Sequence, residues 1–224
     1  VQLSGLSPDL ILFVVDKNYK LLGSITDGDI RRGLIQEFNL NDQIEGIIQR
    51  DTKFVTVGDL DIQKIIDYKR DLIQIVPIVN ERKEIQRIIS FREYFSFLSI
   101  DVVIMAGGKG ERLRPLTENT PKPLLNVGGK SIIEQNLNRF IKYGMTNFWI
   151  SINYLGDLIK NHLGEGPFTD IKINYLEEDK PLGTIGVLSK GVKFKSGYVL
   201  LTNSDILTNL DYEDFLFKFL RSDA

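Results

Sequence analysis

The sequence predicts an α/β fold in the second part of the chain, preceded by a smaller α+β unit that contains an internal repeat. From Val102 onward, apolar strands alternate with helical segments, which is typical of a mostly parallel sheet covered on both faces. Before residue 98, one strand–turn–strand pattern occurs twice. The short join "LSID" at 98–101 separates the two parts, so we expect two domains, 1–97 and 101–224.

The repeat consists of "DLILFVVDKNYKLLGSITDGD" (9–29) and "DLIQIVPIVNERKEIQRIISFRE" (71–93). Each copy has an apolar strand, a polar turn of hairpin type, a second strand, and an acidic residue three positions after Ser or Thr. An offset of 64 residues aligns Val14 with Ile78, Thr26 with Ser90, and Asp29 with Glu93. We interpret the copies as two strand–strand–helix units, which should pack as a pair because neither can bury its own sheet alone.

Two further elements are expected between the copies. The segment "FVTV" (54–57) is typical of a strand. The segment "DIQKIIDYKR" (61–70) is typical of a helix, with Ile62, Ile65 and Ile66 on one face.

In the second part, strands are predicted at 102–106, 147–152, 171–175 and 198–203. A helix should begin after Ser131, because Ser131 and Glu134 have the spacing of a capping box. Its apolar stripe and its stop signal are formed by Ile133, Leu137, Phe140, Ile141 and Gly144. We expect His162 to be a surface or packing residue and Trp149 to belong to the core.

The composition excludes several classes of protein. The net charge of −2 argues against nucleic-acid or membrane-surface binding, which normally requires a basic excess. The absence of cysteine rules out disulfides and thiolate zinc sites and fits a cytoplasmic protein. No apolar run is long enough to span a bilayer.

The loop after the first strand, "AGGKGERLRPLTENTPKPLL", has the residues of an anion site. Leu113 occupies the third glycine position of a dinucleotide fingerprint and Leu124 the first glycine position of a P-loop, so neither motif applies. Glycines allow main-chain N–H groups to approach phosphate closely. Arg112 can fork onto phosphate oxygens, and Lys122, held between Pro121 and Pro123, supplies a point charge.

Ligands of parallel sheets bind beyond the carboxyl ends of the strands. The glycine loop and "NSD" (203–205) both follow predicted strands, so they should share one crevice.

The segment "AGGKGERLRPLTENTPKPLLNVGGKSIIE" closely resembles the signature of sugar-1-phosphate nucleotidyltransferases. The resemblance continues through "INYLGDLIKNHLG", "EEDKPLGTIGVL" and "VLLTNSDILTN" and covers most of 102–224. It implies a Rossmann-like fold of GT-A type and an Mg²⁺-dependent reaction of an NTP with a sugar 1-phosphate to give an NDP-sugar and pyrophosphate. The wording "ENTPKPLLNVGGK" looks most like the mannose/heptose guanylyltransferase branch, which favours GTP. Thymidylyl, uridylyl or cytidylyl transfer and a non-catalytic nucleotide sensor are the alternatives.

The resemblance also implies roles for the matching residues. Arg112 and Lys122 would be catalytic, with Arg112 on the β- and γ-phosphates and Lys122 on the α-phosphate and the incoming sugar phosphate. Asp205 would bind Mg²⁺. The nucleotide would be bound by Gly107, Gly108, Gly110 and Gly183. Arg114 is expected either to join this group or to face solvent.

The repeat, with "GSITDGDIRR", resembles a CBS-domain pair, the module that often binds adenosine nucleotides. Thr26 and Asp29 match the positions that contact ribose in that family. The second copy has Arg87 where the first has Gly23, which would block that pocket or direct it toward phosphate. The pair would serve as a regulatory or a scaffolding module and favour a homo-oligomer.

Compared with members of both families, the chain is expected to contain only part of each domain. The first copy of the repeat looks shortened at its N-terminus. The catalytic domain, ending at Ala224, would hold the nucleotide-binding half and would bind NTP weakly with little turnover.

Overall fold

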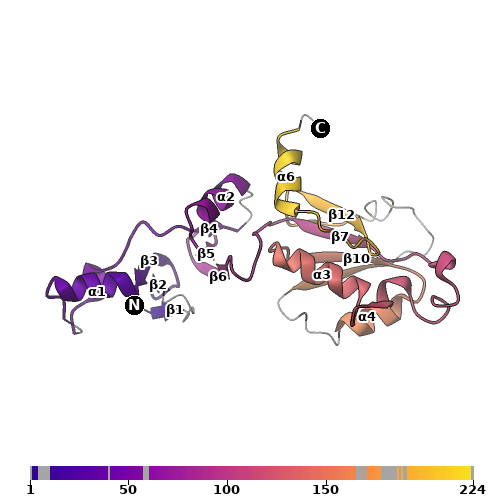
Figure 1. Ribbon diagram of the computed structural model, residues 1–224, viewed down its shortest axis with the longest axis horizontal. Helices are drawn as coiled ribbons and strands as arrows, with labels where there is room; N and C mark the ends of the chain where they lie inside the picture. Colours follow the sequence, from indigo (N-terminus) through magenta and orange to yellow (C-terminus); the bar gives the residue numbers. More distant parts are fainter. Residues whose placement is uncertain are drawn as a thin grey trace. The chain divides into compact units, whose positions relative to one another are not determined.

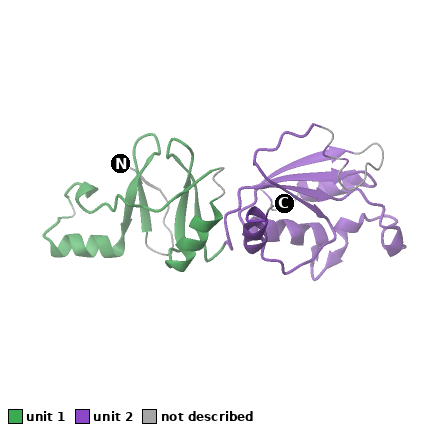
Figure 2. Ribbon diagram, turned by 90° about the horizontal axis from the view of Figure 1, so that it is seen from above, with its two compact units in different colours: residues 1–93 green, residues 94–224 purple. Residues whose placement is uncertain are grey.

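In a computed structural model of the protein, the described residues are 2–4, 11–39, 41–57, 61–164, 168, 171–177, 186, 188 and 191–222. The chain divides into two compact units, residues 1–93 and 94–224 (Figure 2). Gly183, one of the expected nucleotide-binding residues, lies outside the described residues.

The first unit contains two three-stranded sheets, with the strand orders β1-β2-β3 and β4-β5-β6 (Figure 1). In each sheet the last two strands form an antiparallel hairpin. The elements of this unit are β1 (Gln2–Ser4), β2 (Ile11–Val15), β3 (Leu21–Thr26), α1 (Asp27–Ile35), η1 (Ile44–Gly46), β4 (Val55–Thr56), α2 (Ile62–Arg70), β5 (Ile75–Val79) and β6 (Ile85–Ser90).

The two hairpins repeat one another in backbone detail. The register shifts between Val14 and Val15 in the first and between Ile78 and Val79 in the second, which are equivalent positions. The turns also correspond. The Asp16 carboxylate accepts the N–H groups of Asn18 and Lys20, and the Asn80 side-chain oxygen accepts those of Arg82 and Glu84.

The hairpins contact each other through equivalent residues, as the repeat predicts. An isolated antiparallel bridge joins Lys20 to Glu84. The N–H of Leu21 donates to the carbonyl of Lys83 at 2.8 Å, and the N–H of Ile85 donates to that of Tyr19 at 3.0 Å. This reciprocity is the signature of a local two-fold relation, so the pairing of the copies is confirmed.

The second copy corrects the expectation of two strand–strand–helix units. Helix α1 follows β3, but residues 91–100 after β6 contain no helix. The reason is tertiary: the main chain at Phe95 and Leu98 donates to the carbonyls of Lys142 and Tyr143, at the end of a helix of the second unit. Those residues therefore belong to the other unit, where their hydrogen bonds are made.

The second unit is an α/β structure around a four-stranded parallel sheet with the order β11-β10-β7-β12 (Figure 1). The predicted strands are confirmed to within one or two residues. The elements are β7 (Asp101–Met105), η2 (Glu111–Leu113), η3 (Lys122–Leu124), β8 (Asn126–Val127), β9 (Lys130–Ser131), α3 (Ile132–Lys142), β10 (Asn147–Ile152), α4 (Gly156–Gly164), β11 (Lys172–Glu177), β12 (Val199–Asn203) and α6 (Tyr212–Leu220).

Helix α3 packs its apolar stripe on one face of this sheet. The predicted capping box is present, since the side chains of Ser131 and Glu134 each accept the other residue's main-chain N–H. Ile133, Leu137 and Phe140 are buried, and the Phe140 ring lies 6.3 Å from that of Phe148 on β10. On the opposite face, Trp149 is half-buried and meets Phe194 edge to face.

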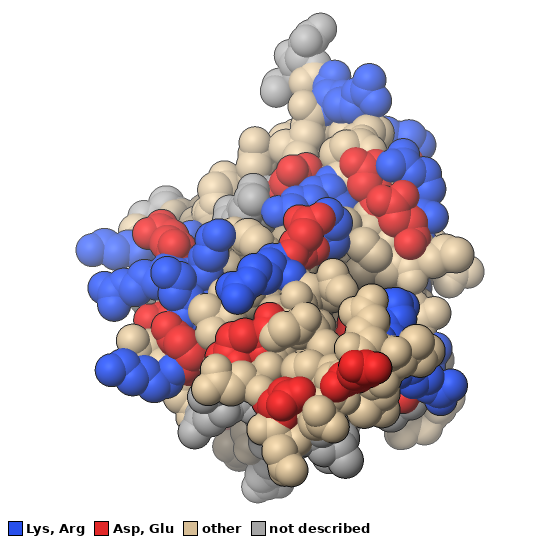
Figure 3. Space-filling view, turned by 90° about the vertical axis from the view of Figure 1, so that its left-hand side faces the viewer, with Lys and Arg blue, Asp and Glu red and all other residues tan. Residues whose placement is uncertain are grey.

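The surface of the chain carries both signs of charge. On the face drawn in Figure 3, Lys and Arg side chains are interspersed with Asp and Glu side chains. Oppositely charged side chains also form surface ion pairs, such as Arg31 with Asp27 at 2.7 Å. Among the described residues, every α-helix is too short or too polar to be a membrane-spanning segment.

A buried carboxylate fixes the start of the central strand. Asp101 is fully buried, and its Oδ2 accepts the N–H groups of Lys195 and Ser196 at 2.7 and 2.9 Å. Its other oxygen accepts the side-chain amide of Asn147, at the start of β10. One side chain therefore ties β7 to its neighbour β10 and to the turn that leads into β12.

We expect Asp101→Ala to lower the free energy of unfolding of the second unit by about 3 kcal/mol, because the main-chain N–H groups of Lys195 and Ser196 and the amide of Asn147 lose a charged acceptor. Trp149, the one tryptophan of the chain, lies in β10, so its fluorescence during urea unfolding reports on this unit alone. The control is Asp214→Ala, which removes an exposed ion pair with Lys218 and should cost less than about 1 kcal/mol. Equal losses in the two variants would contradict the role given to Asp101.

Candidate functional site

A cleft of about 710 Å³ lies at the carboxyl ends of β7 and β12. The two strands are hydrogen-bonded neighbours, and Met105 and Asn203 at their ends are register partners. The chain leaves β7 toward β10 on one side and later returns to β12 on the other, so the cleft occupies the topological switch point, where open α/β sheets bind ligands. It is lined by Met105, Ala106, Gly107, Gly108, Lys109, Gly110, Glu111, Arg112, Leu113, Lys122, Pro123, Asn153, Asn203, Ser204 and Asp205.

The three described glycines of the loop line this cleft for different reasons. Gly107 packs closely, since a Cβ there would lie 3.2 Å from the Cβ of Asn153. Gly110 has a φ of +62°, in the left-handed region, and a Cβ there would lie 3.0 Å from Thr117. Gly108 faces open space, with no atom within 4 Å of such a Cβ. The main chain at Gly108 is therefore the part of the loop that a ligand can approach.

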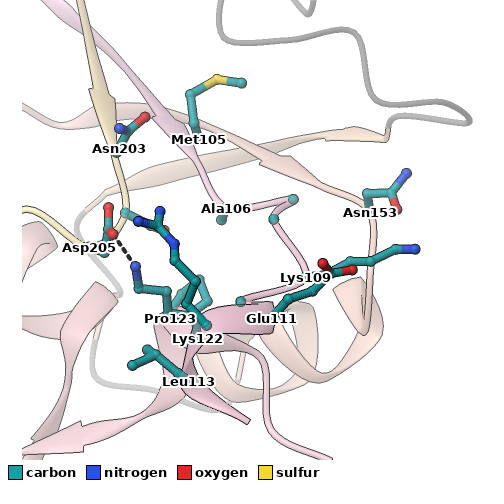
Figure 4. Close-up of a pocket in the computed structure, with 15 residues that line it drawn as sticks. Met105, Ala106, Lys109, Glu111, Leu113, Lys122, Pro123, Asn153, Asn203 and Asp205 are labelled. Carbon is teal, nitrogen blue, oxygen red and sulfur yellow. Dashed lines mark hydrogen bonds and ion pairs between the residues drawn. The ribbon is translucent and has the colours of Figure 1, made fainter. Parts of the chain in front are cut away.

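The two expected cations enter the cleft from two short 3₁₀ turns. Arg112 lies in η2, and Lys122 is the first residue of η3, with Pro121 and Pro123 buried on either side of it. The Nζ of Lys122 contacts Oδ2 of Asp205 in an ion pair (Figure 4). Lys109, from the same loop, points away from Asp205 (Figure 4). The sequence prediction that Arg112, Lys122 and Asp205 share one crevice agrees with this geometry.

Asp205 is placed by contacts of the residue before it. The N–H of Ser204 donates to the carbonyl of Met105 at 3.0 Å, which prolongs the pairing of β12 with β7. The carbonyl of Ser204 accepts the side-chain amide of Asn136 on α3 at 2.8 Å. Asp205 thus follows a main-chain segment that is held on both sides.

The local charges favour the ionised form of Asp205. The hydrogen bond from Lys122 lowers the pKa of the Asp205 carboxyl, and the charges of Lys122 and Arg112 lower it further, while partial burial acts in the opposite direction. Side-chain exposures of 28% for Lys122 and 34% for Asp205 leave the pair accessible to a ligand. At neutral pH the cleft therefore presents a carboxylate with a cation already against it.

The donor set suits Mg²⁺ that arrives with a phosphate ligand. Mg²⁺ is usually held by one or two carboxylates together with substrate phosphates and water. Asp205 supplies one carboxylate, and the ammonium of Lys122 stands where a cation would be attracted. No group of three His, Cys, Asp or Glu side chains able to hold a metal ion occurs among the described residues. The residues present fit a metal shared with a nucleotide.

Two residues that shape the site, Thr117 and Asn153, were not recognised from the sequence. Thr117 holds the glycine loop by donating its hydroxyl to the carbonyl of Gly110 at 2.8 Å. Asn153 follows β10 and lines the cleft, and its place after a strand was the only available signal.

Arg114 is exposed and is not among the described residues that line the cleft. His162 is exposed on α4 and lies 3.3 Å from the side-chain oxygens of Ser131 and Glu134, in keeping with the expected surface role.

In the first unit, the expected ribose-binding residues are engaged with the protein itself. Thr26 is the N-cap of α1 and forms a capping box with Asp29. One oxygen of Asp29 accepts the main-chain N–H and the hydroxyl of Thr26, at 2.8 and 2.6 Å. The other accepts Arg32 at 2.5 Å and Gln49 at 2.9 Å. Burial favours the neutral form of this carboxyl, but these hydrogen bonds outweigh it and its pKa is lowered.

The difference between Gly23 and Arg87 has a clear local cause in the first copy. The segment containing Gln49 pairs with the edge strand β3, through hydrogen bonds of 3.0 and 2.9 Å between the main chains of Ser24 and Gln49. A Cβ on Gly23 would lie 2.7 Å from the carbonyl oxygen of Gln49. Glycine thus allows this close approach, which brings the side chain of Gln49 to the carboxylate of Asp29.

Comparison with known proteins gives partial matches to several nucleotidyltransferases. The chain is 39% identical over 112 residues to N-acetylmuramate alpha-1-phosphate uridylyltransferase of Neisseria meningitidis, a match that covers 49% of this chain and 48% of that protein. It is 31% identical over 118 residues to mannose-1-phosphate guanylyltransferase of Mycobacterium tuberculosis, covering 52% of this chain and 33% of that protein. Among solved structures, HddC from Yersinia pseudotuberculosis complexed with GMP-PN matches with 30% identity and a TM-score of 0.48, covering 55% of this chain and 56% of that one.

The chain thus spans about half or less of the length of these curated relatives. The family model described as "Nucleotidyl transferase" matches residues 101–224, which include the whole of the cleft and more than half of the chain. The predicted family is confirmed: through these residues, the chain belongs to the nucleotidyl transferase family.

Proposed function

We propose that the protein transfers a nucleotidyl group from an NTP, with GTP favoured, to a sugar 1-phosphate, giving an NDP-sugar and pyrophosphate. The observation that carries this proposal is the convergence of Arg112, Lys122 and Asp205 beside the open glycine loop at the switch point of the sheet. The names of the relatives support it, since they include a uridylyltransferase and a guanylyltransferase for sugar 1-phosphates.

The chemistry needs alignment and charge compensation more than a base. A phosphate monoester has a second pKa of about 6, so the sugar phosphate is already anionic near neutral pH. One of its oxygens attacks the α-phosphorus of the NTP, a new P–O bond forms, and the bond to the β-phosphate oxygen breaks as pyrophosphate leaves. Phosphoryl-type transfers of this kind are accelerated mainly by positioning and electrostatic stabilisation.

Four residues of the cleft have a role in this scheme. The main chain around Gly108 accommodates the triphosphate, and Arg112 grips the β- and γ-phosphates that depart. Lys122 neutralises the α-phosphate and the incoming phosphate. Asp205 would hold Mg²⁺, which when bound neutralises phosphate charge and orients the leaving group.

In the structure, Lys122 and Asp205 neutralise each other. For both to act on substrate, the ion pair has to open as the nucleotide enters. Since both side chains are partly exposed, opening costs little compared with the interactions gained from a polyanion. The pair thus keeps the two groups in place before the substrate arrives.

The base of the NTP substrate distinguishes several related nucleotidyl transfers. The wording of the loop favours guanylyl transfer, while the relative with the highest identity given above is a uridylyltransferase. Thymidylyl and cytidylyl transfer are the further alternatives of the same chemistry. A non-catalytic nucleotide sensor is the alternative of a different class.

For the first unit we propose a CBS-like pair that acts as a scaffold, with association into a homo-oligomer. The saturation of Asp29 by Thr26, Arg32 and Gln49 favours this role over binding of an adenosine nucleotide, because a ribose would have to displace those partners. Regulation by an adenosine nucleotide is the alternative.

Lys122→Ala in the full-length protein should reduce pyrophosphate release from Mg²⁺·NTP and a sugar 1-phosphate by at least about 100-fold, because a charge that acts in the transition state is lost. A panel of GTP, UTP, dTTP and CTP with several sugar 1-phosphates identifies the substrate pair.

Arg114→Ala, at an exposed residue outside the described cleft lining, is the control and should leave turnover unchanged. Unchanged turnover in Lys122→Ala would show that the mechanism is wrong. Absence of turnover with every pair, together with tight NTP binding, would favour the sensor.

Lys122→Met should raise the pKa of the Asp205 carboxyl toward its ordinary value, because its main hydrogen bond and nearest positive charge are removed. The sign follows from the direction of the shift: the folded-state pKa is lowered, so the stabilisation is present above the ordinary pKa and is lost as the pH falls through the folded-state value. Titration of the ¹³C carboxyl resonance measures this directly. Lys109 points away from Asp205, so Lys109→Met should leave the pKa of the Asp205 carboxyl unchanged. An equal rise of this pKa in both variants would contradict a specific Lys122–Asp205 contact.

AMP should show no calorimetric binding to the wild-type chain at micromolar concentrations if the first unit is a scaffold. Asp29→Ala should then lower the stability of that unit, because Thr26, Arg32 and Gln49 lose their acceptor. Micromolar AMP binding that disappears in Asp29→Ala would instead establish the regulatory role. Thr52→Ala, which removes a hydroxyl from the same neighbourhood without touching Asp29, is the matched control.

A further inference from the structure

One polar side chain of α3 is buried within the apolar side of that helix. Asn136 is 5% exposed and lies between Ile133 and Leu137, which are fully buried. The start of the helix does not need it, since Ser131 and Glu134 provide the capping box. A buried amide costs stability unless its hydrogen bonds are made. Its Nδ2 donates to the carbonyl oxygen of Ser204 at 2.8 Å, across 68 residues of sequence.

This hydrogen bond controls the main chain immediately before Asp205. The carbonyl of Ser204 and the nitrogen of Asp205 belong to one planar peptide group. Because this oxygen is held, the orientation of the peptide plane that leads into Asp205 is held as well. The N–H of Ser204 is bound as well, to the carbonyl of Met105 at 3.0 Å. With both groups held, the remaining freedom of Asp205 is in its own φ and its side-chain rotamer.

We propose that Asn136 is a positioning residue: it orients the Ser204–Asp205 peptide and thereby keeps the Asp205 carboxylate aimed at Lys122 and at the metal–nucleotide complex. The inference rests on the proposed function for the role of Asp205, and on the structure alone for the orientation. Asn136 lies behind the loop and is not among the described residues that line the cleft, so it acts through Asp205 and not on the substrate.

The chain offers a matched control on the same helix. Arg139, three residues further along α3, also holds the segment that follows β12, donating from Nη2 to the carbonyl of Leu210 at 2.6 Å. That contact is five residues beyond Asp205. If anchoring of the segment in general were what mattered, Arg139→Met would have the same consequences as a change at Asn136.

The first experiment is a double-mutant cycle on binding of Mg²⁺·GTP, or of whichever NTP the wild type prefers, by calorimetry. Asn136→Leu keeps the size of the side chain and removes the donor. It should weaken binding about tenfold, as loss of residues that orient metal ligands does. In an Asp205→Asn background the same change should have less than a twofold effect, since the two residues act through one interaction. With EDTA present, Asn136→Leu should bind the nucleotide like the wild type, and Arg139→Met should do so in both conditions.

The second experiment needs no nucleotide. Nuclear Overhauser contacts between the ε-CH₂ protons of Lys122 and the β-CH₂ protons of Asp205 should be present in the wild type and in Arg139→Met, and lost in Asn136→Leu. Urea unfolding followed by Trp149 fluorescence shows whether the variant is folded. If Asn136→Leu is not folded, Asn136→Ala, which also lacks the donor, takes its place in both experiments.

The outcomes separate this proposal from the proposed function. If no NTP binds to the wild type, the proposed function fails, and the proton contacts still decide the role of Asn136. If those contacts persist in a folded Asn136 variant, or if the effect on Mg²⁺·NTP binding is undiminished in the Asp205→Asn background, the positioning role is overturned.

Discussion

The structure of the second unit depends on the parallel pairing of β7 with two neighbours at once. β10 and β12 both begin level with Asp101, and this carboxylate binds the amide of Asn147 and the turn at Lys195 and Ser196. Because the chain leaves β7 on one side and arrives at β12 on the other, the carboxyl end of β7 is left uncovered. The glycine loop and Asp205 meet there as a consequence of strand order, although about 100 residues of sequence separate them.

Around that opening, side chains hold the main chain, and the main chain in turn presents the groups that act. Thr117 fixes the glycine loop through the carbonyl of Gly110, and Asn136 fixes the opposite wall through the carbonyl of Ser204. Both holding side chains are nearly or fully buried, whereas Lys122 and Asp205 are partly exposed. The side chains that hold the main chain are therefore buried and neutral, and the charges that must exchange partners remain in contact with solvent. This division suits a site that binds a polyanion by electrostatics in a preformed geometry.

The features predicted correctly from the sequence are those that depend on residues close together in the chain. The capping box of Ser131 and Glu134, the buried stripe of α3 and the strand at 147–152 are set by neighbours in sequence, and each was predicted. Asn136 could not be recognised, because a polar residue within a helix looks solvent-facing until its partner, 68 residues away, is known. The helix expected after β6 failed for the same reason, since residues 95–98 make their hydrogen bonds to the distant end of α3. Thr26 and Asp29 show a further limit: the spacing that suggests a ribose site is also the spacing of a helix cap.

The first unit shows what duplication preserves. The turns at Asp16 and Asn80, the bulges beside them and the reciprocal contact of Lys20 with Glu84 are the same in both hairpins. The edges at β3 and β6 differ, because Gly23 lets the chain at Gln49 pair with β3, while Arg87 stands at the equivalent position of β6. Keeping the contact between the copies while altering the neighbouring edges holds the pair together and removes the equivalence of the two edges. A ligand that approached the pair at Gly23 and at Arg87 would therefore meet two chemically different surfaces.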